Sequence, residues 1–208
     1  MIKIKDATFI TSVASKDKLY KTNKPIIAVA GKSNVGKSSL INMLANRKKL
    51  AKTSVTPGRT RLINYFDFGD FVLADLPGYG FAKVSKEEKK KWAVLLETFL
   101  ATEKIALLLS LVDIRHDPTA DDKMMVNYLY HYAVPFSLVA TKADKLSKTR
   151  IKPRIKEIAA ELRVGVADIT ASSAENGLGK QEILNAIEQA INVQKQALKE
   201  QVEQDDED

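Results

Sequence analysis

The sequence predicts an α/β fold with a mostly parallel sheet of about six strands, one antiparallel edge and helices on both faces. Three observations lead to this expectation. Short apolar runs typical of buried parallel strands recur along the chain, and amphipathic helical patterns lie between them. The 208 residues, 45% of them hydrophobic, are enough to bury a sizeable core. We therefore expect one main folded domain rather than a disordered chain.

The expected strands follow in order along the chain. Four apolar runs are typical of parallel strands, at residues 26–30, 72–74, 105–112 and 136–140. Residues 61–68 instead alternate between polar and apolar side chains, which predicts a half-exposed strand at an antiparallel edge of the sheet.

The expected helices lie between and after these strands. A capping-box pattern at Ser85 and Glu88 precedes one of them, and Thr119 is the cap candidate of the next. Pro153 is predicted to mark the first turn of a third helix. The segment after Ser38 is also helical in pattern. Apolar stripes at helical spacing occupy residues 92–100, 125–132, 155–162 and 183–191.

Charge is distributed unevenly along the chain. The net charge is +7, but six acids and no Lys or Arg stand at positions 200–208. Residues 1–199 therefore hold all 33 basic residues against 20 of the 26 acids, a formal charge of +13. A basic body predicts a polyanionic partner, either nucleic acid or an anionic membrane surface. The alternative is that the excess charge only keeps the protein soluble.

We expect three segments: an N-terminal extension at residues 1–24 packed on the main domain, the main domain at 25–195, and a disordered acidic tail at 196–208. The absence of cysteine excludes disulfides and thiolate metal sites. The longest apolar run has eight residues, too short for a membrane span of about 18–20. The first ten residues do not resemble a secretion signal, so a cytoplasmic protein without a membrane anchor is expected.

The most specific motif directly follows the 26–30 strand and matches GxxxxGK[ST]. Its glycines let backbone N–H groups surround phosphate oxygens, and the following helix adds positive potential at its N-terminus. Lys37 is expected to reach the β- and γ-phosphates, and the Ser38 hydroxyl to bind Mg²⁺. The expected phosphate-binding residues are Gly31, Lys32, Ser33, Asn34, Val35, Gly36, Lys37 and Ser38.

A second motif stands where the 72–74 strand ends. Asp75 follows that strand and is 37 residues after Ser38. In a phosphate-loop protein an acid at this place lies beside the Mg²⁺ shell, and the following glycine contacts the γ-phosphate. The residues of this motif are Asp75, Leu76, Pro77 and Gly78.

A third motif predicts which base is bound. Thr141, Lys142, Ala143 and Asp144 follow the 136–140 strand and resemble the guanine-reading Asn-Lys-x-Asp motif, with Thr in place of Asn. A carboxylate at Asp144 accepts hydrogen bonds from guanine N1–H and the exocyclic amine, whereas adenine would leave it unpaired. Lys142 is expected to lay its alkyl chain over the ring. Ser172, Ser173 and Ala174 resemble the loop that meets guanine O6.

These blocks in this order identify the chain as a P-loop GTPase of the translation-factor-like class. The strings LINYF (62–66), DLPGYGFAKVS (75–85) and VDIRHDPTADD (112–122) resemble the EngB family, also called YsxC or YihA. Between Thr56 and Thr60 the chain resembles a first switch loop. The resemblance implies a Ras-like fold, slow GTP hydrolysis and nucleotide contacts from Gly58, Arg59, Thr60, Arg61 and Leu62.

The same resemblance implies a mechanism based on positioning. Ser38 and Thr60 would bind Mg²⁺ directly and Asp75 through water, while Lys37 and Thr60 would position the phosphates and stabilise charge. Tyr79 stands where Ras-like proteins have the glutamine that orients water, so no general base is identified. Related GTPases with Asn at the position of Asn34 are able to bind K⁺ beside the phosphates, and an Asn that only holds the loop is the alternative.

Family members assemble the large ribosomal subunit, which implies a monomeric switch that binds GTP, GDP and that subunit or its RNA and supports cell division. Two basic clusters flank the expected switches: Arg47, Lys48, Lys49 and Lys52, and then Lys83, Lys86, Lys89, Lys90 and Lys91. Three alternatives remain at this point, namely a P-loop kinase, a membrane-linked GTPase and a nucleotide-regulated scaffold without turnover. Arg115 and His116 are interpreted as part of a turn before a helix rather than as a catalytic pair.

Overall fold

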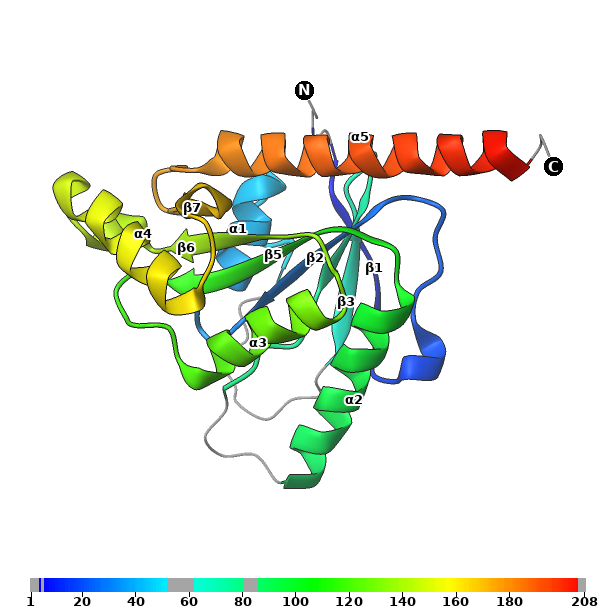
Figure 1. Ribbon diagram of the computed structural model, residues 1–208, viewed down its shortest axis with the longest axis horizontal. Helices are drawn as coiled ribbons and strands as arrows, with labels where there is room; N and C mark the ends of the chain where they lie inside the picture. The colour runs from blue at the N-terminus through cyan, green and yellow to red at the C-terminus, as the bar shows by residue number, and fades with distance from the viewer. Residues whose placement is uncertain (1–3, 5, 52–61, 81–85, 206–208) are drawn as a thin grey trace.

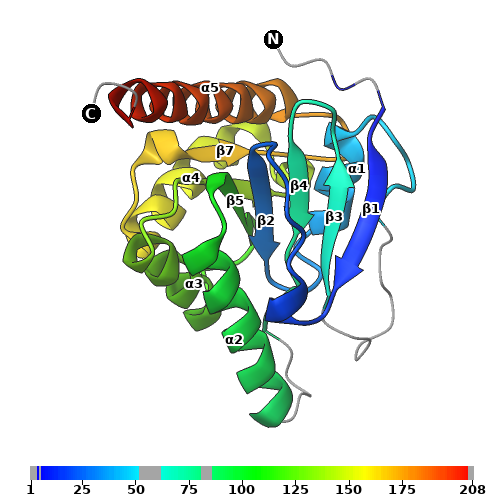
Figure 2. The ribbon, with the colours of Figure 1, turned by 90° about the vertical axis from the view of Figure 1, so that its right-hand side faces the viewer.

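Seven strands form one sheet in the part of the chain that the computed structural model describes, residues 4, 6–51, 62–80 and 86–205. Their order across the sheet is β1-β3-β4-β2-β5-β6-β7, and Figure 2 labels β1, β3, β4 and β2 side by side. Strand β3 runs antiparallel to both of its neighbours, and the other pairs are parallel. The strands are β1 (Thr8–Val13), β2 (Ile26–Gly31), β3 (Ile63–Asp67), β4 (Val72–Asp75), β5 (Ile105–Asp113), β6 (Phe136–Thr141) and β7 (Ile169–Ala171).

The edge of the sheet differs from the expectation in one respect. The 61–68 pattern does form an antiparallel strand, β3, but β3 is not the edge because β1 pairs along its outer side (Figure 2). A register shift between Phe9 and Thr11 marks a bulge in β1. The bulge interrupts the two-residue alternation of exposed and buried side chains, which would otherwise indicate a strand in the sequence. The N-terminal segment thus contributes a strand that periodicity alone did not reveal.

Five α-helices in the described residues cover the two faces of the sheet. One face packs against α1 (Lys37–Leu44) and α5 (Lys180–Asp205). The opposite face packs against α2 (Lys86–Thr102), α3 (Ala120–His131) and α4 (Lys148–Leu162). Figures 1 and 2 show α5 lying across one side of the sheet while α2 and α3 cross the other. None of the helices described here is long and apolar enough to cross a membrane.

The helical stripes read from the sequence are the buried faces of these helices. In α2, Trp92, Leu95, Leu96, Phe99 and Leu100 are all buried against the sheet. Thr119 is the N-cap of α3 as expected, and its backbone N–H and its hydroxyl both donate to the Asp122 carboxylate of the capping box, at 2.8 and 2.7 Å. Side-chain periodicity therefore predicted which faces of α2, α3, α4 and α5 meet the core.

Two helix boundaries correct the sequence expectations. Helix α4 begins at Lys148, so Pro153 stands inside the helix rather than in its first turn. Helix α5 continues to Asp205, so residues 196–205 of the segment expected to be a disordered tail are helical. Among the α5 side chains that the structure describes, Ile191 is the last buried one, and helix propagation carries the backbone beyond the packed part.

The strands β2, β4, β5 and β6 are parallel, so their carboxyl ends lie together at the same end of the sheet. In open α/β sheets, loops that leave this end form the ligand crevice. The chain's motif-bearing segments begin there, at Gly31, Asp75, Asp113 and Thr141. The topology therefore gathers residues that are up to 110 positions apart in the sequence.

Candidate nucleotide-binding site

The loop between β2 and α1 has the tight turn that a phosphate-binding loop needs. A Cβ on Gly31 would stand 2.8 Å from Val35 Cγ1 and 3.0 Å from Leu111 Cβ, so only glycine fits there. Gly36 has a φ of 112° and precedes the first residue of α1. This left-handed backbone turns the chain so that the N-terminal N–H groups of α1 face the loop.

Lys37 and Asp75 meet at the start of α1. The Lys37 ammonium donates to Asp75 Oδ1, and Asn64 Nδ2 donates to Oδ2 of the same carboxylate at 3.4 Å. Asp75 is only 6% exposed, so these donors stabilise its charge inside the protein. The structure thus joins the two sequence motifs that contain Lys37 and Asp75. Asn64 was not identified as a site residue from the sequence. Its place in the site follows from the pairing of β3 with β4, in which Asn64 stands opposite Asp75.

The segment after β4 is fastened to the phosphate-binding loop. The backbone N–H and the hydroxyl of Ser33 both donate to the Tyr79 carbonyl, at 3.0 and 3.1 Å. The Leu76 N–H donates to the Val29 carbonyl at 2.9 Å, and Trp92 Nε1 donates to the Pro77 carbonyl at 3.3 Å. These contacts hold Leu76, Pro77 and Gly78 beside the loop.

The Tyr79 side chain points away from that loop. Its hydroxyl donates to Asp122 Oδ1 of α3 at 2.9 Å, and its ring lies 6.2 Å from that of Trp92. Burial, and then the nearby charge of Asp122, raise the pKa of Tyr79 well above its usual value. Tyr79 is therefore neutral and buried, and it connects to α3. It stands at the position where Ras-like proteins have the glutamine that orients water.

Thr141 connects the third motif to the first. Its hydroxyl lies 2.6 Å from the Val35 carbonyl oxygen and 3.0 Å from that of Val112, and the side chain is buried. A hydroxyl shares its proton between such acceptors and so ties the loop to the ends of β5 and β6. Threonine in place of asparagine therefore still bonds this motif to the phosphate-binding loop.

Lys142 extends this connection. Its backbone is left-handed, with a φ of 61°, and its ammonium donates to the Asn34 carbonyl at 2.7 Å and to Asp113 Oδ2 at 2.8 Å. Arg115 also binds Asp113 through two hydrogen bonds of 2.9 and 2.8 Å. Burial alone would raise the pKa of Asp113, but the hydrogen bonds from Arg115 and Lys142 outweigh it and hold that pKa well below its usual range.

Asp113 and Arg115 are site residues that sequence reasoning missed in these roles. The available signal was an acid at the carboxyl end of β5, beside the strand that leads into Lys142. Arg115 does not act with His116 in any contact that the described residues show; it binds Asp113 and thereby fixes the partner of Lys142.

Asp144 is oriented from two sides. Ser173 Oγ donates to its Oδ1 at 2.7 Å, and Lys145 Nζ lies 2.8 Å from its Oδ2. The hydrogen bond from Lys145, followed by that from Ser173, lowers the pKa of Asp144, so the group is a carboxylate at neutral pH. The Ala143 N–H donates to the Ser172 carbonyl at 3.0 Å, which joins the two segments.

A pocket of about 230 Å³ opens where these segments meet. Most of the residues around it belong to the predicted motifs or adjoin them. The pocket is lined by Gly36, Ser39, Leu40, Thr141, Lys142, Asp144, Lys145, Ser172, Ala174 and Glu175. Of the predicted first switch, Leu62 precedes β3, while Gly58, Arg59, Thr60 and Arg61 lie outside the described residues.

Comparison with known proteins agrees with this arrangement. Residues 26–142 match the family described as "50S ribosome-binding GTPase". A probable GTP-binding protein EngB from Caldanaerobacter subterraneus subsp. tengcongensis is 47% identical over 192 residues, which cover 91% of this chain and 99% of the relative. A Bacillus cereus protein of the same name is 42% identical, covering 89% of this chain and 96% of its own.

Solved structures share the fold. A crystal structure of a probable GTP-binding protein EngB has a TM-score of 0.67 at 24% identity, covering 80% of this chain and 98% of that one. Era, solved with MgGDPNP and nucleotides 1506–1542 of 16S ribosomal RNA, has a TM-score of 0.60 at 24% identity, covering 80% and 56%. The full-length sequence similarity and the family match together show that the chain belongs to the EngB family of P-loop GTPases, which bind and hydrolyse GTP.

Proposed function

We propose that this GTPase is a switch in the assembly of the large ribosomal subunit, and that its GTP form docks on ribosomal RNA. The observation that carries the proposal is the strongly basic body, +13 over residues 1–199, in a chain that matches a family described as ribosome-binding. The protein Era, which shares the fold, has been solved with ribosomal RNA. In this proposal the protein is a cytoplasmic monomer and affects cell division through the supply of ribosomes.

The proposed nucleotide contacts follow the geometry of the site. The loop from Gly31 to Ser38 holds the phosphates, and Lys37 neutralises their charge. A phosphate in the loop would compete with Asp75 for the Lys37 ammonium, because both are anions within its reach. Asp144 reads guanine, and Lys142 covers the ring from its position between Asn34 and Asp113. Residues 25–195 form the GTPase unit in this assignment.

The residues present fit a magnesium ion. Ser38 stands in the first turn of α1 and Asp75 is a carboxylate at the end of β4, and both offer the hard oxygen atoms that Mg²⁺ prefers. We assign Ser38 and Thr60 as its direct ligands and Asp75 as a ligand through water. The ion would supply charge neutralisation at the phosphates.

Slow turnover is proposed because the residues that the structure describes include no evident water-orienting side chain at the loop. Tyr79 is held by Asp122, and its hydroxyl faces α3 rather than the loop. Positioning by the loop and charge stabilisation by Lys37 and Thr60 would carry the basal rate, with further help from a partner.

Asn34 gives a second, smaller proposal about ions. The Asn34 side chain is exposed, and its backbone is left-handed, with a φ of 63°. Its carbonyl accepts a hydrogen bond from the Lys142 ammonium. Such a loop is able to offer oxygen atoms to K⁺ beside the phosphates. Comparing GTP hydrolysis in KCl and NaCl of equal concentration tests this, and equal rates would contradict it.

Co-sedimentation with ribosomal particles tests the main proposal. The protein is mixed with purified 30S, 50S and 70S particles in the presence of a GTP analogue, of GDP or of neither. We expect it to pellet with the 50S particles or their precursors, and most strongly with the GTP analogue. Binding that ignores the nucleotide, or that is equal for 30S and 50S particles, would contradict the proposal.

A further inference from the structure

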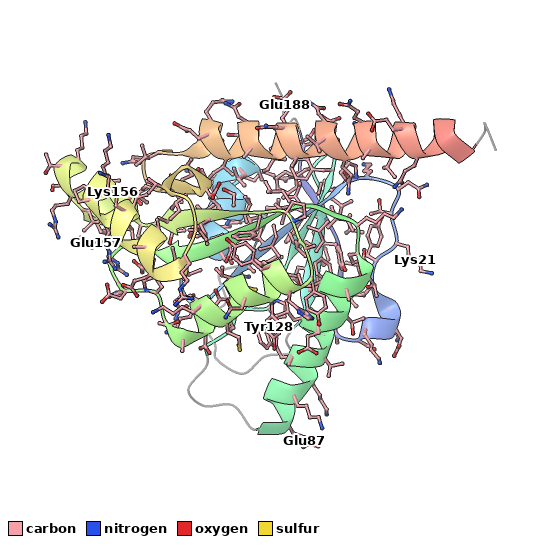
Figure 3. The ribbon with its side chains drawn as sticks, viewed as in Figure 1. Lys21, Glu87, Tyr128, Lys156, Glu157 and Glu188 are labelled. Atoms are coloured by element: carbon pink, nitrogen blue, oxygen red, sulfur yellow. The ribbon has the colours of Figure 1, made fainter. Side chains whose placement is uncertain are left out.

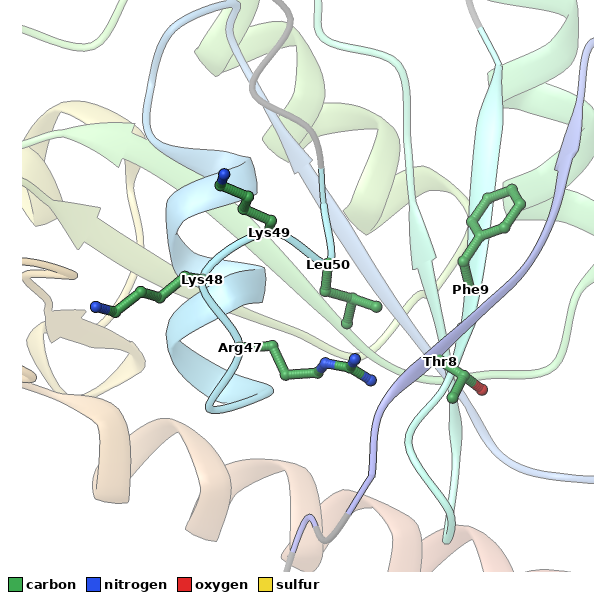
Figure 4. Close-up of a pocket in the computed structure, with 6 residues that line it drawn as sticks. All are labelled: Thr8, Phe9, Arg47, Lys48, Lys49 and Leu50. Atoms are coloured by element: carbon green, nitrogen blue, oxygen red, sulfur yellow. The ribbon is translucent and has the colours of Figure 1, made fainter.

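A second pocket lies away from the nucleotide site, between the edge strand β1 and the segment that follows α1. It has a volume of about 620 Å³ and is open to solvent (Figure 4). Its described lining residues are Thr8, Phe9, Arg47, Lys48, Lys49 and Leu50, none of which is acidic. The nucleotide-binding motifs do not include any of them.

Phe9 presents an aromatic ring at one side of this pocket. The residue pairs with Phe66 across the two strands, and the two rings meet edge to face with centroids 5.7 Å apart. Phe9 is nevertheless 54% exposed as a residue, and it stands on the last strand of the sheet directly before the bulge. The contact with Phe66 holds the ring in place while much of the residue faces solvent.

Cations line the opposite side. Arg47 donates from Nη1 to the Ala7 carbonyl at 2.8 Å, which fixes the segment after α1 against β1. Lys48 and Lys49 are exposed and form no ion pair with the residues that the structure describes. The acids nearest these residues are Asp6, which is exposed two positions before Thr8, and Asp67, opposite Thr8 on β3, whose carboxylate Lys24 binds at 2.9 Å. The pocket therefore has a positive rim beside an aromatic ring.

We propose that this pocket binds single-stranded RNA, with one unpaired base stacked on Phe9 and the neighbouring phosphates against Lys48 and Lys49. The inference rests on the proposed function and specifies the kind of RNA that is recognised. Aromatic rings beside cations bind unpaired bases irrespective of sequence, because every base has a π-face. In a duplex the base faces are stacked inside and out of reach of Phe9. An acidic peptide would use the lysines without needing the ring.

Binding of an oligonucleotide tests the contribution of the ring. The probe is a fluorescein-labelled oligouridylate of about ten nucleotides, and fluorescence anisotropy is measured with the full chain saturated with GTP analogue. Phe9→Ala should weaken binding about tenfold without altering its salt dependence, and Phe9→Tyr should restore it. Tyr130→Ala is the matched control, because Tyr130 is 57% exposed and also packs edge to face, on Phe136. The control should bind as the unaltered protein does.

Substituting the lysines should change the salt dependence of RNA binding, which substituting Phe9 should not. Each phosphate contact contributes about −0.7 to the slope of log affinity against log salt for a single strand. The double change Lys48→Ala and Lys49→Ala should therefore make that slope shallower by about 1.4. Lys152→Ala with Lys156→Ala is the control of equal charge, on α4 at the other end of the sheet, where Figure 3 labels Lys156. This control should leave the slope nearly unchanged.

The outcomes separate this inference from the proposed function. Unchanged affinity in Phe9→Ala, equal affinity for an RNA duplex, or equally effective competition by oligoglutamate would overturn the pocket inference. If one of these three results is found but the protein still co-sediments with the 50S particle, only the pocket inference fails. Oligonucleotide binding with the expected signatures, but no co-sedimentation with any particle, would overturn the ribosome proposal and retain the pocket. Thermal unfolding and GDP affinity of each variant verify that its fold is intact.

Discussion

Asp144 is the residue expected to choose the base, because its carboxylate matches the two donors on the guanine edge. Ser173 and Lys145 orient this carboxylate and lower its pKa. Asp144→Asn removes the charge and presents an amide donor instead. We expect GTP affinity to fall more than tenfold and preference to shift toward xanthine nucleotides, whose C2 carbonyl accepts from an amide.

Competition of GTP, XTP and ATP for fluorescent GDP measures this change. The unaltered protein should reject ATP, because adenine leaves the Asp144 carboxylate unpaired. Equal competition by ATP and GTP would contradict the assignment of the base. Since the hydrogen bonds from Lys145 and Ser173 lower the pKa of Asp144, its contribution should be constant through the neutral range and be lost only in solution more acidic than the usual titration range of an aspartate.

Lys37 and Thr60 should have separable effects. In the proposed assignment, Lys37 binds the phosphates of both nucleotides, whereas Thr60 belongs to a switch loop that is held only when the γ-phosphate is present. Lys37→Ala should reduce GDP and GTP binding, while Thr60→Ala should spare GDP binding and impair Mg²⁺-dependent hydrolysis. GDP titration and single-turnover hydrolysis decide this. The switch assignment is wrong if Thr60→Ala loses GDP as severely as Lys37→Ala.

Tyr79 is expected to stabilise the fold rather than to act in hydrolysis. Tyr79→Phe removes the hydroxyl that donates to Asp122 and should lower the free energy of unfolding by about 1–2 kcal/mol. The hydrolysis rate should change less than about twofold. A large loss of turnover at unchanged GTP affinity would show that the hydroxyl takes part in the reaction.

The same variant has a distinct response to alkaline pH. The folded protein raises the pKa of Tyr79, so folding favours the neutral phenol. This stabilisation is complete below the unfolded pKa near 10 and is lost as the pH rises above it. The melting temperature of the unaltered protein should therefore fall more between pH 9 and 11 than that of Tyr79→Phe.

At the scale of elements, α5 consists of a packed part and an exposed part. Ile183, Ile187 and Ile191 are buried in the core, and the described side chains beyond Gln194 are exposed. Deleting residues 196–208 should thus change the melting temperature by no more than a few degrees. Ile187→Ala, by contrast, should cost about 2–5 kcal/mol because it opens a cavity. Thermal unfolding of both variants checks this, and a strong loss on truncation would assign the exposed turns a stabilising role.

At the scale of the whole molecule, nucleotide state and surface charge are expected to be coupled. The start of α2 follows, along the chain, the motif from Asp75 to Gly78, which is the expected second switch, and projects from the body, where Figure 3 labels Glu87. Phosphate contacts release counterions, so particle binding should weaken steeply with salt. Reversing the charge of Lys86, Lys89 and Lys90 together should weaken co-sedimentation and reduce its salt dependence. GDP affinity should remain nearly unchanged.

The matched control reverses three exposed lysines of α4, Lys148, Lys152 and Lys156. It has the same net charge as the test variant but alters α4, which packs at the β6–β7 end of the sheet, so it should retain most particle binding. Equal loss in both variants would show that net charge alone, rather than a surface beside the switches, determines the interaction.

Much of the fold and site could be predicted from the sequence because the signals are local. Apolar runs predicted β2, β4, β5 and β6, and helical stripes predicted the buried faces of α2 and α3. The phosphate-binding loop has glycines at Gly31 and Gly36. A Cβ at Gly31 would clash with its neighbours, and Gly36 adopts a left-handed turn. These features depend on residues close together in the chain, whose periodicity and backbone preferences are visible without the fold.

Only the tertiary structure decided how these parts constrain one another. Tyr79 became an anchor because Asp122, 43 positions later, lies beside it. Lys142 bonds Asn34 across 108 positions, and Arg115 secures the same lysine through Asp113. The bulge that conceals β1 in the sequence also leaves Phe9 facing a basic pocket formed by residues nearly 40 positions away. Such contacts depend on chain segments meeting in space, so a local pattern of residues contains no information about them.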